Sequence, residues 1–297
     1  MKQCDASSVR KILLVCALVA GLLSGCSEGG NNTAKKTSEI DQVEVIGSFG
    51  NTPEITYPDD FKITAPQSKP LWQGETEGIK EGDVIALKIY AKDVSSGEMI
   101  RDDSEALPVV YQFTQENVGS ELYAALFGLP PQSRVLHLSN SEDSSIIMVV
   151  DILPTQVSGV ENTDQISGVS VTFDTEPQVS IDQSVSPPTT LAISQKILGR
   201  GPQIQSGSQV LIRVKSVKWS DGSVIESNWG PDGIPKPIIV GQDRLIEGLE
   251  EALIDIPQGA RIVVTVPPAL AFQPTENELA QETIVYVIDI LAVQSSS

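Results

Sequence analysis

Two parts of this sequence repeat the same order of segments. Residues 49–55 (FGNTPEI) have a counterpart in residues 173–179 (FDTEPQV), and each follows a short stretch in which valine alternates with other residues. Further on, residues 81–87 and 206–212 each combine a glycine-containing turn with a run of aliphatic residues. Solenoid repeats recur about every 20–50 residues, whereas these counterparts lie about 125 residues apart. The spacing predicts two tandem domains built on one plan.

The two copies differ near their ends. The tripeptide Asp-Ile-Leu occurs at residues 151–153 and again at 289–291, an offset about 13 residues longer than that of the earlier counterparts. In the first copy, two apolar runs (133–138 and 146–152) flank a short polar turn, which is typical of a β-hairpin. The second copy has residues 267–282 at this point. We therefore expect an α+β fold with several antiparallel strands and one short helix in each copy, and a long loop in the second copy only.

Residues 245–272 of the second copy contain three local signals in a fixed order. Apolar residues recur at positions 245, 249, 252 and 253, which is the spacing of an amphipathic helix and predicts a helix over residues 245–254. The sequence Pro257-Gln258-Gly259 ends it, because proline and glycine interrupt helical patterns. The β-branched run of residues 260–266 predicts a strand that ends at Pro267-Pro268. Phe272 lies in the loop that follows.

This order resembles the signature of the FKBP family of peptidyl-prolyl isomerases, which is roughly V-I-x-G-W-E-E-G, then M-x-x-G, a strand and P-P-x-Y-A-Y. Residues 217–227 (VKWSDGSVIES) are similar to another family segment, V-x-W-x-D-G-x-x-F-D-S-S. The resemblance implies an α+β fold of two tandem FKBP-like domains, each a twisted antiparallel half-barrel sheet wrapped on one short helix. It also implies that the long loop overhangs the active site, so the first copy has lost that wall of the pocket.

The resemblance places the family's pocket on the second copy, residue by residue. Glu226 stands at the pocket aspartate, Ile246 at the residue whose backbone N–H binds the substrate carbonyl, and Phe272 at the loop tyrosine. These three are the catalytic candidates. The substrate-binding candidates are five apolar or aromatic residues: Val214, Ile225, Leu245, Leu249 and Tyr286. Leu249 replaces the tryptophan of the pocket floor and Phe272 lacks a hydroxyl, so aromatic area and one hydrogen-bond donor are lost. Plain core packing is the alternative reading for each apolar residue.

The first copy departs further from the family pattern. Tyr90 falls where the resemblance would place the strand tyrosine, and Ile100 and Arg101 occupy the phenylalanine and aspartate positions. Arg101 reverses the charge of the aspartate. Together with the missing loop, this predicts that the usual site is absent from the first copy. Val118 and Leu122 fall in an expected helix over residues 117–127, as core residues.

The N-terminus has the pattern of an export signal. Lys2, Arg10 and Lys11 precede about a dozen mostly apolar residues, a run shorter than the roughly 20 residues that span a bilayer. The run ends in Leu23-Ser24-Gly25-Cys26, which resembles the lipobox of a bacterial, actinobacterial-type lipoprotein and implies lipidation of Cys26. An ordinary signal peptide that contains a cysteine is the alternative. The expected segments are a signal over residues 1–25, a flexible tether over 26–42, a degenerate FKBP-like domain over 43–154 and a second FKBP-like domain over 155–297.

Charge and motifs narrow the possible partners. The chain has 39 acidic against 20 basic residues, a formal net charge of −19, which argues against binding to nucleic acid. The single histidine, His137, lies in an alternating apolar stretch and is interpreted as a structural residue. The sequence contains no zinc-ligand spacing, phosphate-binding loop or dinucleotide fingerprint, so neither a metal nor a cofactor is expected.

Prolyl isomerisation requires no nucleophile or metal, because its barrier of about 18–20 kcal/mol arises from amide resonance. A dry apolar pocket that favours the twisted amide lowers this barrier. The first hypothesis is therefore an exported isomerase, lipid-anchored on the extracytoplasmic face of the cell membrane, that acts on proline-containing segments of exported proteins through its second domain. The alternative is a non-catalytic FKBP-like chaperone or protein-binding lipoprotein.

Overall fold

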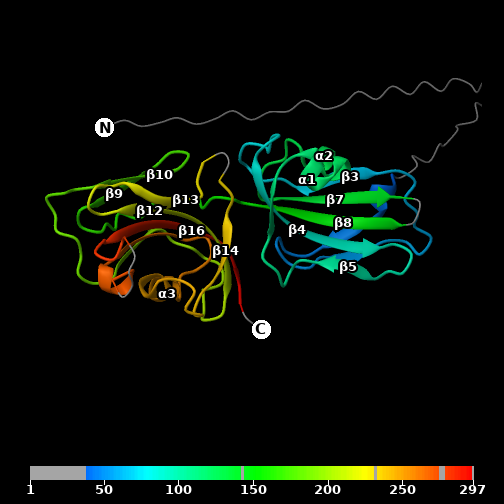
Figure 1. The fold of residues 1–297 in the computed structure, drawn as a ribbon. Helices are drawn as coiled ribbons and strands as arrows, with labels where there is room; N and C mark the ends of the chain where they lie inside the picture. The colour runs from blue at the N-terminus through cyan, green and yellow to red at the C-terminus, as the bar shows by residue number, and fades with distance from the viewer. Residues whose placement is uncertain (1–37, 142–143, 231–232, 274–277, 296–297) are drawn as a thin grey trace, which may run out of the picture. The chain divides into compact units, whose positions relative to one another are not determined.

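A computed structural model of the 297-residue chain describes residues 38–297, except for residues 142–143, 231–232, 274–277 and 296–297. The expected signal, Cys26 and most of the tether lie outside the described residues. Within the described part, two six-stranded antiparallel sheets dominate the fold, one in each copy of the repeat (Figure 1). In that same part, no helix is long and apolar enough to cross a membrane.

The first domain contains, in chain order, η1 (Glu39–Gln42), β1 (Glu44–Ile46), β2 (Glu54–Thr56), β3 (Gln67–Trp72), β4 (Val84–Asp93), β5 (Met99–Asp102), β6 (Val109–Gln112), α1 (Gln115–Val118), α2 (Ser120–Leu126), β7 (Ser133–Asn140) and β8 (Ser145–Leu153). The second domain contains β9 (Val169–Phe173), β10 (Pro177–Ile181), β11 (Ala192–Ile197), β12 (Gln209–Lys218), β13 (Val224–Ser227), β14 (Lys236–Ile239), α3 (Glu247–Leu253), β15 (Arg261–Val266), η2 (Pro268–Leu270) and β16 (Ile284–Gln294).

Both sheets have the same strand order. It is β3-β7-β8-β4-β5 in the first domain, with β6 also paired to β4, and β11-β15-β16-β12-β13 in the second, with β14 also paired to β12. Each domain adds a two-stranded sheet from its N-terminal segment, β1–β2 and β9–β10. The predicted α+β class is confirmed. The helix, strand and hairpin expected from sequence correspond to α3, β15 and β7–β8.

Each six-stranded sheet is covered on both faces. In the second domain, α3 packs on the face that contains Ile212 and Val264, and the β9–β10 hairpin packs on the opposite face, at Val263 and Val287. In the first domain, α1 and α2 lie on one face and residues 39–63 lie on the other. Neighbouring strand residues such as Val263 and Val264 enter different cores because strand side chains alternate between faces.

Two details of the predicted boundaries are wrong. The tether was expected to reach residue 42, but Glu39–Gln42 form η1, and Ile40 is buried in the core of the first domain. The carboxylate of Glu39 also accepts hydrogen bonds from the backbone N–H and hydroxyl of Thr64. The helix expected over residues 117–127 is divided into α1 and α2, because Gly119 has a φ of +81°, outside the helical region.

A buried arginine–aspartate pair occupies the same place in each sheet. Arg134 on β7 donates from Nε and Nη2 to Asp151 on β8, each at 2.6 Å, and both side chains are completely buried. Arg261 on β15 donates to Asp289 on β16 in the same two-point manner, at 2.6 and 2.9 Å. In each sheet the two residues lie directly opposite each other on paired strands. Two parallel charge-assisted hydrogen bonds fix the geometry of such a pair.

Each pair also holds the N-terminal segment of its domain. Arg134 donates to the carbonyl oxygens of Gly47, Ser48 and Asn51, in the loop between β1 and β2. In the second domain, the carbonyl of Val157 accepts from Arg261, and the N–H of Val157 donates to Asp289. The charged groups are therefore paired and hydrogen-bonded, as burial requires.

The repeated phenylalanines lie close to these pairs. The ring of Phe173 lies over the Arg261 guanidinium, with 3.2 Å between the ring centroid and Cζ. In the first domain, Phe49 contacts Trp72, and the Trp72 ring lies 4.9 Å from Cζ of Arg134. Aromatic faces attract cations. The repeated phenylalanines thus both lie in aromatic groups beside a buried charge, with direct contact in the second domain and contact through Trp72 in the first.

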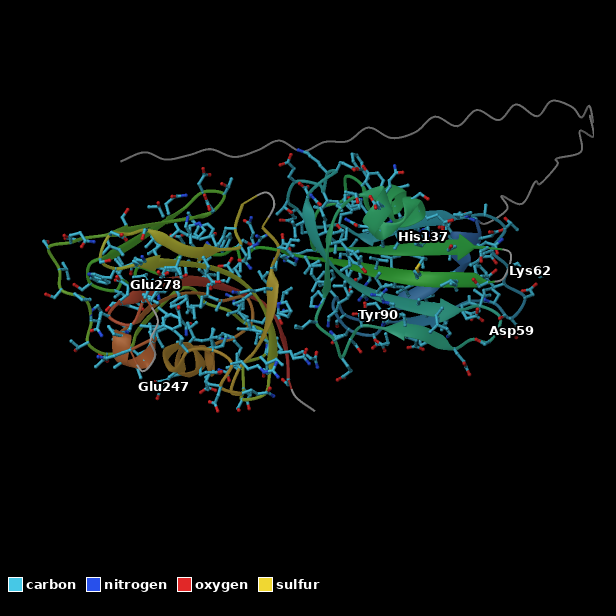
Figure 2. All side chains as sticks on the ribbon, viewed as in Figure 1. Asp59, Lys62, Tyr90, His137, Glu247 and Glu278 are labelled. Carbon is cyan, nitrogen blue, oxygen red and sulfur yellow. The ribbon has the colours of Figure 1, made fainter. Side chains whose placement is uncertain are left out.

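His137 has the structural environment that its sequence context suggested (Figure 2). It is 2% exposed on β7. Its Nδ1 lies 2.8 Å from the Ser68 hydroxyl, and its Nε2 lies 3.3 Å from a carboxylate oxygen of Glu121. Burial lowers the pKa of His137, and this effect exceeds the opposing effect of Glu121. The neutral imidazole is therefore favoured in the fold.

Loss of one member of a buried ion pair should strongly destabilise its domain. We expect Asp289→Ala to lower the free energy of unfolding by about 3–5 kcal/mol, because the Arg261 charge would stay buried without a partner. Urea titration followed by tryptophan fluorescence measures this loss. The matched control is Asp41→Ala, since Asp41 forms an exposed pair with Lys69 at 2.6 Å and should cost about 0–1 kcal/mol. Equal losses for the two variants would contradict the assignment.

The lowered pKa of His137 predicts a pH dependence. As the pH falls below about 6.5, the unfolded chain takes up a proton at His137, whereas the folded chain resists it. The stabilisation is therefore present above that pH and decreases as the pH falls. We expect the free energy of unfolding to decrease more between pH 7.5 and 5.5 in the wild type than in His137→Gln. An equal decrease in both proteins would show that His137 is not the responsible group.

Candidate functional site

The face of the second sheet below α3 brings together the residues that the sequence singled out. Val214 on β12 and Tyr286 on β16 are buried, at 2% and 5% exposure. Ile225 on β13, Leu249 on α3 and Phe272 after β15 pack against the same cluster and are half-buried. The result is an apolar surface with a buried floor and partly exposed walls.

Leu245 and Ile246 complete this surface from the segment just before α3. The Ile246 carbonyl accepts hydrogen bonds from the N–H groups of Leu249 and Glu250, which begins the helix. Within the part of the chain that the structure describes, the N–H of Ile246 makes no hydrogen bond. A backbone donor is thus available next to the apolar surface.

The carboxylate of Glu250 fixes the turn that leads to this donor. It accepts hydrogen bonds from the N–H groups of Gly241, Arg244 and Leu245, the last two at 3.2 Å. One side chain of α3 therefore holds three backbone N–H groups of the preceding loop. Because the loop and the helix are tied together, the position of Ile246 is determined by both.

Glu226 lies at the rim of the same face. On β12, Ser216 is paired with Glu226 on one side and with Tyr286 on the other. Residues directly opposite each other share a face, so the Glu226 carboxylate lies on the side of Tyr286. It forms an ion pair with Lys236 of β14 at 2.9 Å, and both side chains are nearly half-exposed. Burial raises the pKa of the Tyr286 phenol, and the Glu226 charge raises it further.

The loop after β15 approaches α3 closely. Leu270 and Ala271 pack against the cluster together with Phe272. Gly248 lies at the start of α3, where an added Cβ would overlap the Val266 side chain and touch Leu270. Glycine at this position therefore allows the helix, β15 and the loop to meet.

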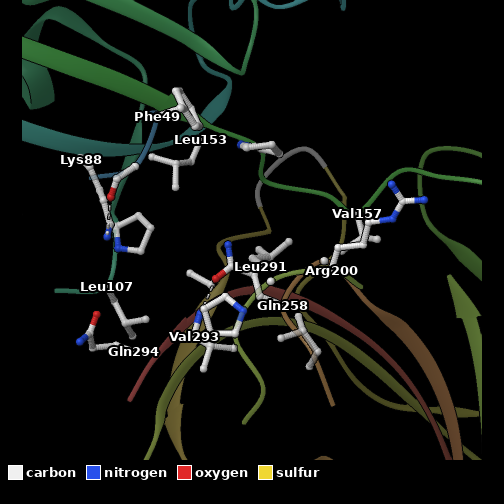
Figure 3. Close-up of a pocket in the computed structure, with 18 of the residues that line it drawn as sticks. Phe49, Lys88, Leu107, Leu153, Val157, Arg200, Gln258, Leu291, Val293 and Gln294 are labelled. Atoms are coloured by element: carbon white, nitrogen blue, oxygen red, sulfur yellow. Dashed lines mark hydrogen bonds between the residues drawn. The ribbon is translucent and has the colours of Figure 1, made fainter. Parts of the chain in front are cut away.

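The turn that ends α3 is fixed to the last strand. The side-chain carbonyl of Gln258 accepts the N–H of Val293 at 3.0 Å (Figure 3). The N–H of Gly259 donates to the carbonyl of Ile290 at 2.8 Å. Both ends of the helix are thus held by the sheet or its loops, which keeps the apolar surface in place.

The first domain lacks several of these groups. Arg101 lies opposite Ala91 on β4, the position equivalent to Glu226 opposite Ser216 on β12. Its Nε and Nη2 bind Asp103 at 2.9–3.1 Å. The β7–β8 hairpin stands where the second domain has its long loop.

The predicted place of Tyr90 is wrong by one residue. Tyr90 belongs to the core on the face opposite α2, whereas Ile89 faces the helices as Val214 does in the second domain. On a strand, a shift of one residue moves a side chain to the other face. Tyr90 is therefore a core residue (Figure 2), and burial raises its pKa.

Sequence reasoning missed Ile238, which reaches the cluster from β14. This strand was not predicted because Pro237 lies inside it, and proline disfavours a strand assignment except at an edge. The isoleucine pair at positions 238 and 239 was the available signal. Among the described residues, no group of three or more His, Cys, Asp or Glu side chains is placed to hold a metal ion.

Comparisons with known proteins find a family similarity within the second domain. A family model described as FKBP-type peptidyl-prolyl cis-trans isomerase matches residues 201–291, which include all eight predicted site residues of the second domain. The probable FK506-binding protein of Corynebacterium glutamicum is 28% identical over 119 residues, covering 39% of this chain and 98% of that protein. The FK506-binding protein of Streptomyces anulatus is 29% identical over 111 residues, covering 36% of this chain and 89% of that protein.

Among solved structures, the three FKBP domains of wheat FKBP73 match 77% of this chain and 94% of that chain, with 15% identity and a TM-score of 0.32. It is the family model that makes residues 201–291 similar to FKBP-type peptidyl-prolyl isomerases. The residues that the family model matches do not include the first domain.

Proposed function

We propose that this protein is an exported, lipid-anchored peptidyl-prolyl cis–trans isomerase of the FKBP type, which assists the folding of extracytoplasmic proteins through its second domain. The family model and the two bacterial relatives support the isomerase part. The observation that carries the proposal is the half-buried apolar surface around Val214 and Tyr286. Beside it lies the N–H of Ile246, which has no hydrogen-bond partner among the described residues.

This geometry suits the physical demands of the reaction. A twisted prolyl amide has lost resonance, so it is less polar than the planar amide and is favoured in an apolar environment. The N–H of Ile246 can hold the carbonyl of the bound segment while the proline ring lies on the apolar surface. Stronger binding of the twisted form than of the planar form lowers the barrier.

The alternative is a non-catalytic FKBP-like chaperone or protein-binding lipoprotein. Leu249 and Phe272 favour it, because they supply less aromatic area and no hydroxyl where the family pattern has tryptophan and tyrosine. The first domain favours it as well, since Arg101 and the β7–β8 hairpin replace the equivalent carboxylate and loop. In this alternative the protein binds unfolded segments or a cell-envelope partner, and it does not accelerate cis–trans exchange.

An exchange assay distinguishes the two functions. We expect the full chain to accelerate cis–trans exchange of a Leu-Pro or Phe-Pro peptide, as measured by two-dimensional NMR exchange or by protease coupling. Glu226→Ala should lower kcat/KM by roughly 3- to 10-fold, equivalent to about 0.6–1.4 kcal/mol of transition-state stabilisation, because the rim of the site loses its carboxylate.

The control for Glu226→Ala is Asp174→Ala. Asp174 is an exposed carboxylate in the turn between β9 and β10, on the sheet face away from α3. Its removal should leave the rate unchanged. Binding of the peptide without any acceleration at micromolar protein would reject the isomerase in favour of the chaperone. An active protein that is indifferent to Glu226→Ala would show that the pocket lies elsewhere.

The proposed anchor depends on Cys26. We expect Cys26→Ser to move the protein from the membrane fraction to the soluble fraction, because attached acyl chains supply the membrane affinity. Immunoblotting of fractionated cells measures the distribution, and Cys16→Ser, within the expected signal, is the matched control. Membrane association that survives Cys26→Ser would contradict lipid anchoring at this residue.

A further inference from the structure

A cavity in the second domain lies next to the candidate proline site. Its volume is about 380 Å³, and it is lined by Gln209, Pro237, Ile238, Ile239, Arg244 and Leu245. Ile238 and Leu245 also belong to the apolar cluster around Val214 and Tyr286. The cavity and the candidate site therefore share two of their walls, and a peptide bound at one can extend into the other.

Arg244 gives this cavity a positive charge. The side chain is exposed, and within the described part of the chain its guanidinium forms no ion pair or hydrogen bond. Two other basic residues of this domain are paired: Lys236 with Glu226, and Arg261 with Asp289. An available arginine is notable in a chain with 39 acidic and 20 basic residues.

The backbone of Arg244 is held in place. Its N–H donates to Glu250 at 3.2 Å, and the N–H of Leu245 donates to the same carboxylate oxygen. The preceding residue, Asp243, has a φ of +53°, so the turn has a defined conformation. The Arg244 side chain therefore starts from a fixed point in the wall of the cavity, two residues before Ile246 in the chain.

We propose that this cavity is a subsite for a glutamate side chain close to the proline of the bound segment. The proposal rests on the proposed function, because it assumes that proline binds at the neighbouring apolar surface. Pro237, Ile238 and Leu245 provide apolar contact for the methylene groups of the glutamate. The planar guanidinium of Arg244 matches the geometry of a carboxylate. The second domain therefore selects acidic proline segments.

Peptides that differ in one residue test this selectivity. Two sets of fluorescent octapeptides contain a Leu-Pro core with glutamate, glutamine or lysine placed either just before or just after the core. Anisotropy titration with the full chain in detergent gives each Kd. In one of the sets, we expect glutamate to bind about 3- to 5-fold more tightly than glutamine at low ionic strength, the range of a partly exposed ion pair. Lysine should bind more weakly than both, and added salt should reduce the differences.

Variants assign the selectivity to one side chain. Arg244→Gln should abolish the preference for glutamate, and Arg244→Glu should favour lysine. Arg200→Gln removes another exposed arginine of the same domain and should leave the preference unchanged. Equal Kd values for glutamate and glutamine in both sets, or a preference that persists in Arg244→Gln, would overturn the subsite.

The exchange rate of the glutamine peptides separates this inference from the proposed function. A glutamate preference that depends on Arg244 but occurs without accelerated exchange would reject the isomerase and support the subsite. Accelerated exchange of the glutamine peptides with no charge preference would support the isomerase and reject the subsite. If no peptide binds, both are rejected.

Discussion

The buried arginine–aspartate pairs constrain this structure more than any other interaction. Arg134–Asp151 joins β7 to β8, and Arg261–Asp289 joins β15 to β16, which are the last two strands of each domain. Each pair also binds the backbone of the N-terminal segment of its domain. A buried pair is weak evidence of a net gain in stability, since desolvation offsets its attraction. Its effect on register is stronger. A shift of one residue in the pairing of β15 and β16 would move Arg261 and Asp289 to different faces, and the cost would be two buried charges without partners.

This constraint acts on one face of each sheet only. The ion pairs, the N-terminal segments and the repeated phenylalanines share the face opposite the helices, and they are similar in the two domains. The helix face differs between the domains. There Glu226 is replaced by Arg101, and the long loop is replaced by a hairpin. A fold that is fixed from one side leaves the other side free to diverge, so the helix face of the second domain can present a carboxylate and a loop that the first domain does not have.

Much of this architecture could be predicted, because many of its helices and strands follow from patterns among neighbouring residues in the sequence. The spacing of Leu245, Leu249 and Leu253 predicts α3 because a helix brings these residues to one face. The two apolar runs on either side of the polar turn at residue 141 predict the β7–β8 hairpin, because a short polar turn between two such runs is typical of paired strands. The features that were not predicted depend on contacts between residues far apart in the sequence or on the exact register of a strand. Pairing of Arg261 with Asp289 joins residues 28 positions apart. The repeated Asp-Ile-Leu tripeptide marks Asp289 in the sequence but does not indicate its partner. The position predicted for Tyr90 was wrong because a shift of one residue along a strand moves a side chain to the opposite face. Strand β14 was not predicted because it contains Pro237, and proline within a run argues against a strand.

The candidate site, too, could be predicted only in part from the sequence. Sequence resemblance brought together residues that the structure places in one cluster, but it could not show which polar groups near them are available. Those are the N–H of Ile246, which lacks a partner among the described residues, and the guanidinium of Arg244. A buried aromatic side chain contributes about 150–250 Å² of contact, and Leu249 supplies less than a tryptophan would. A site with reduced aromatic area gains less from the proline ring itself. The polar groups at its rim must therefore contribute a larger share of the discrimination between segments.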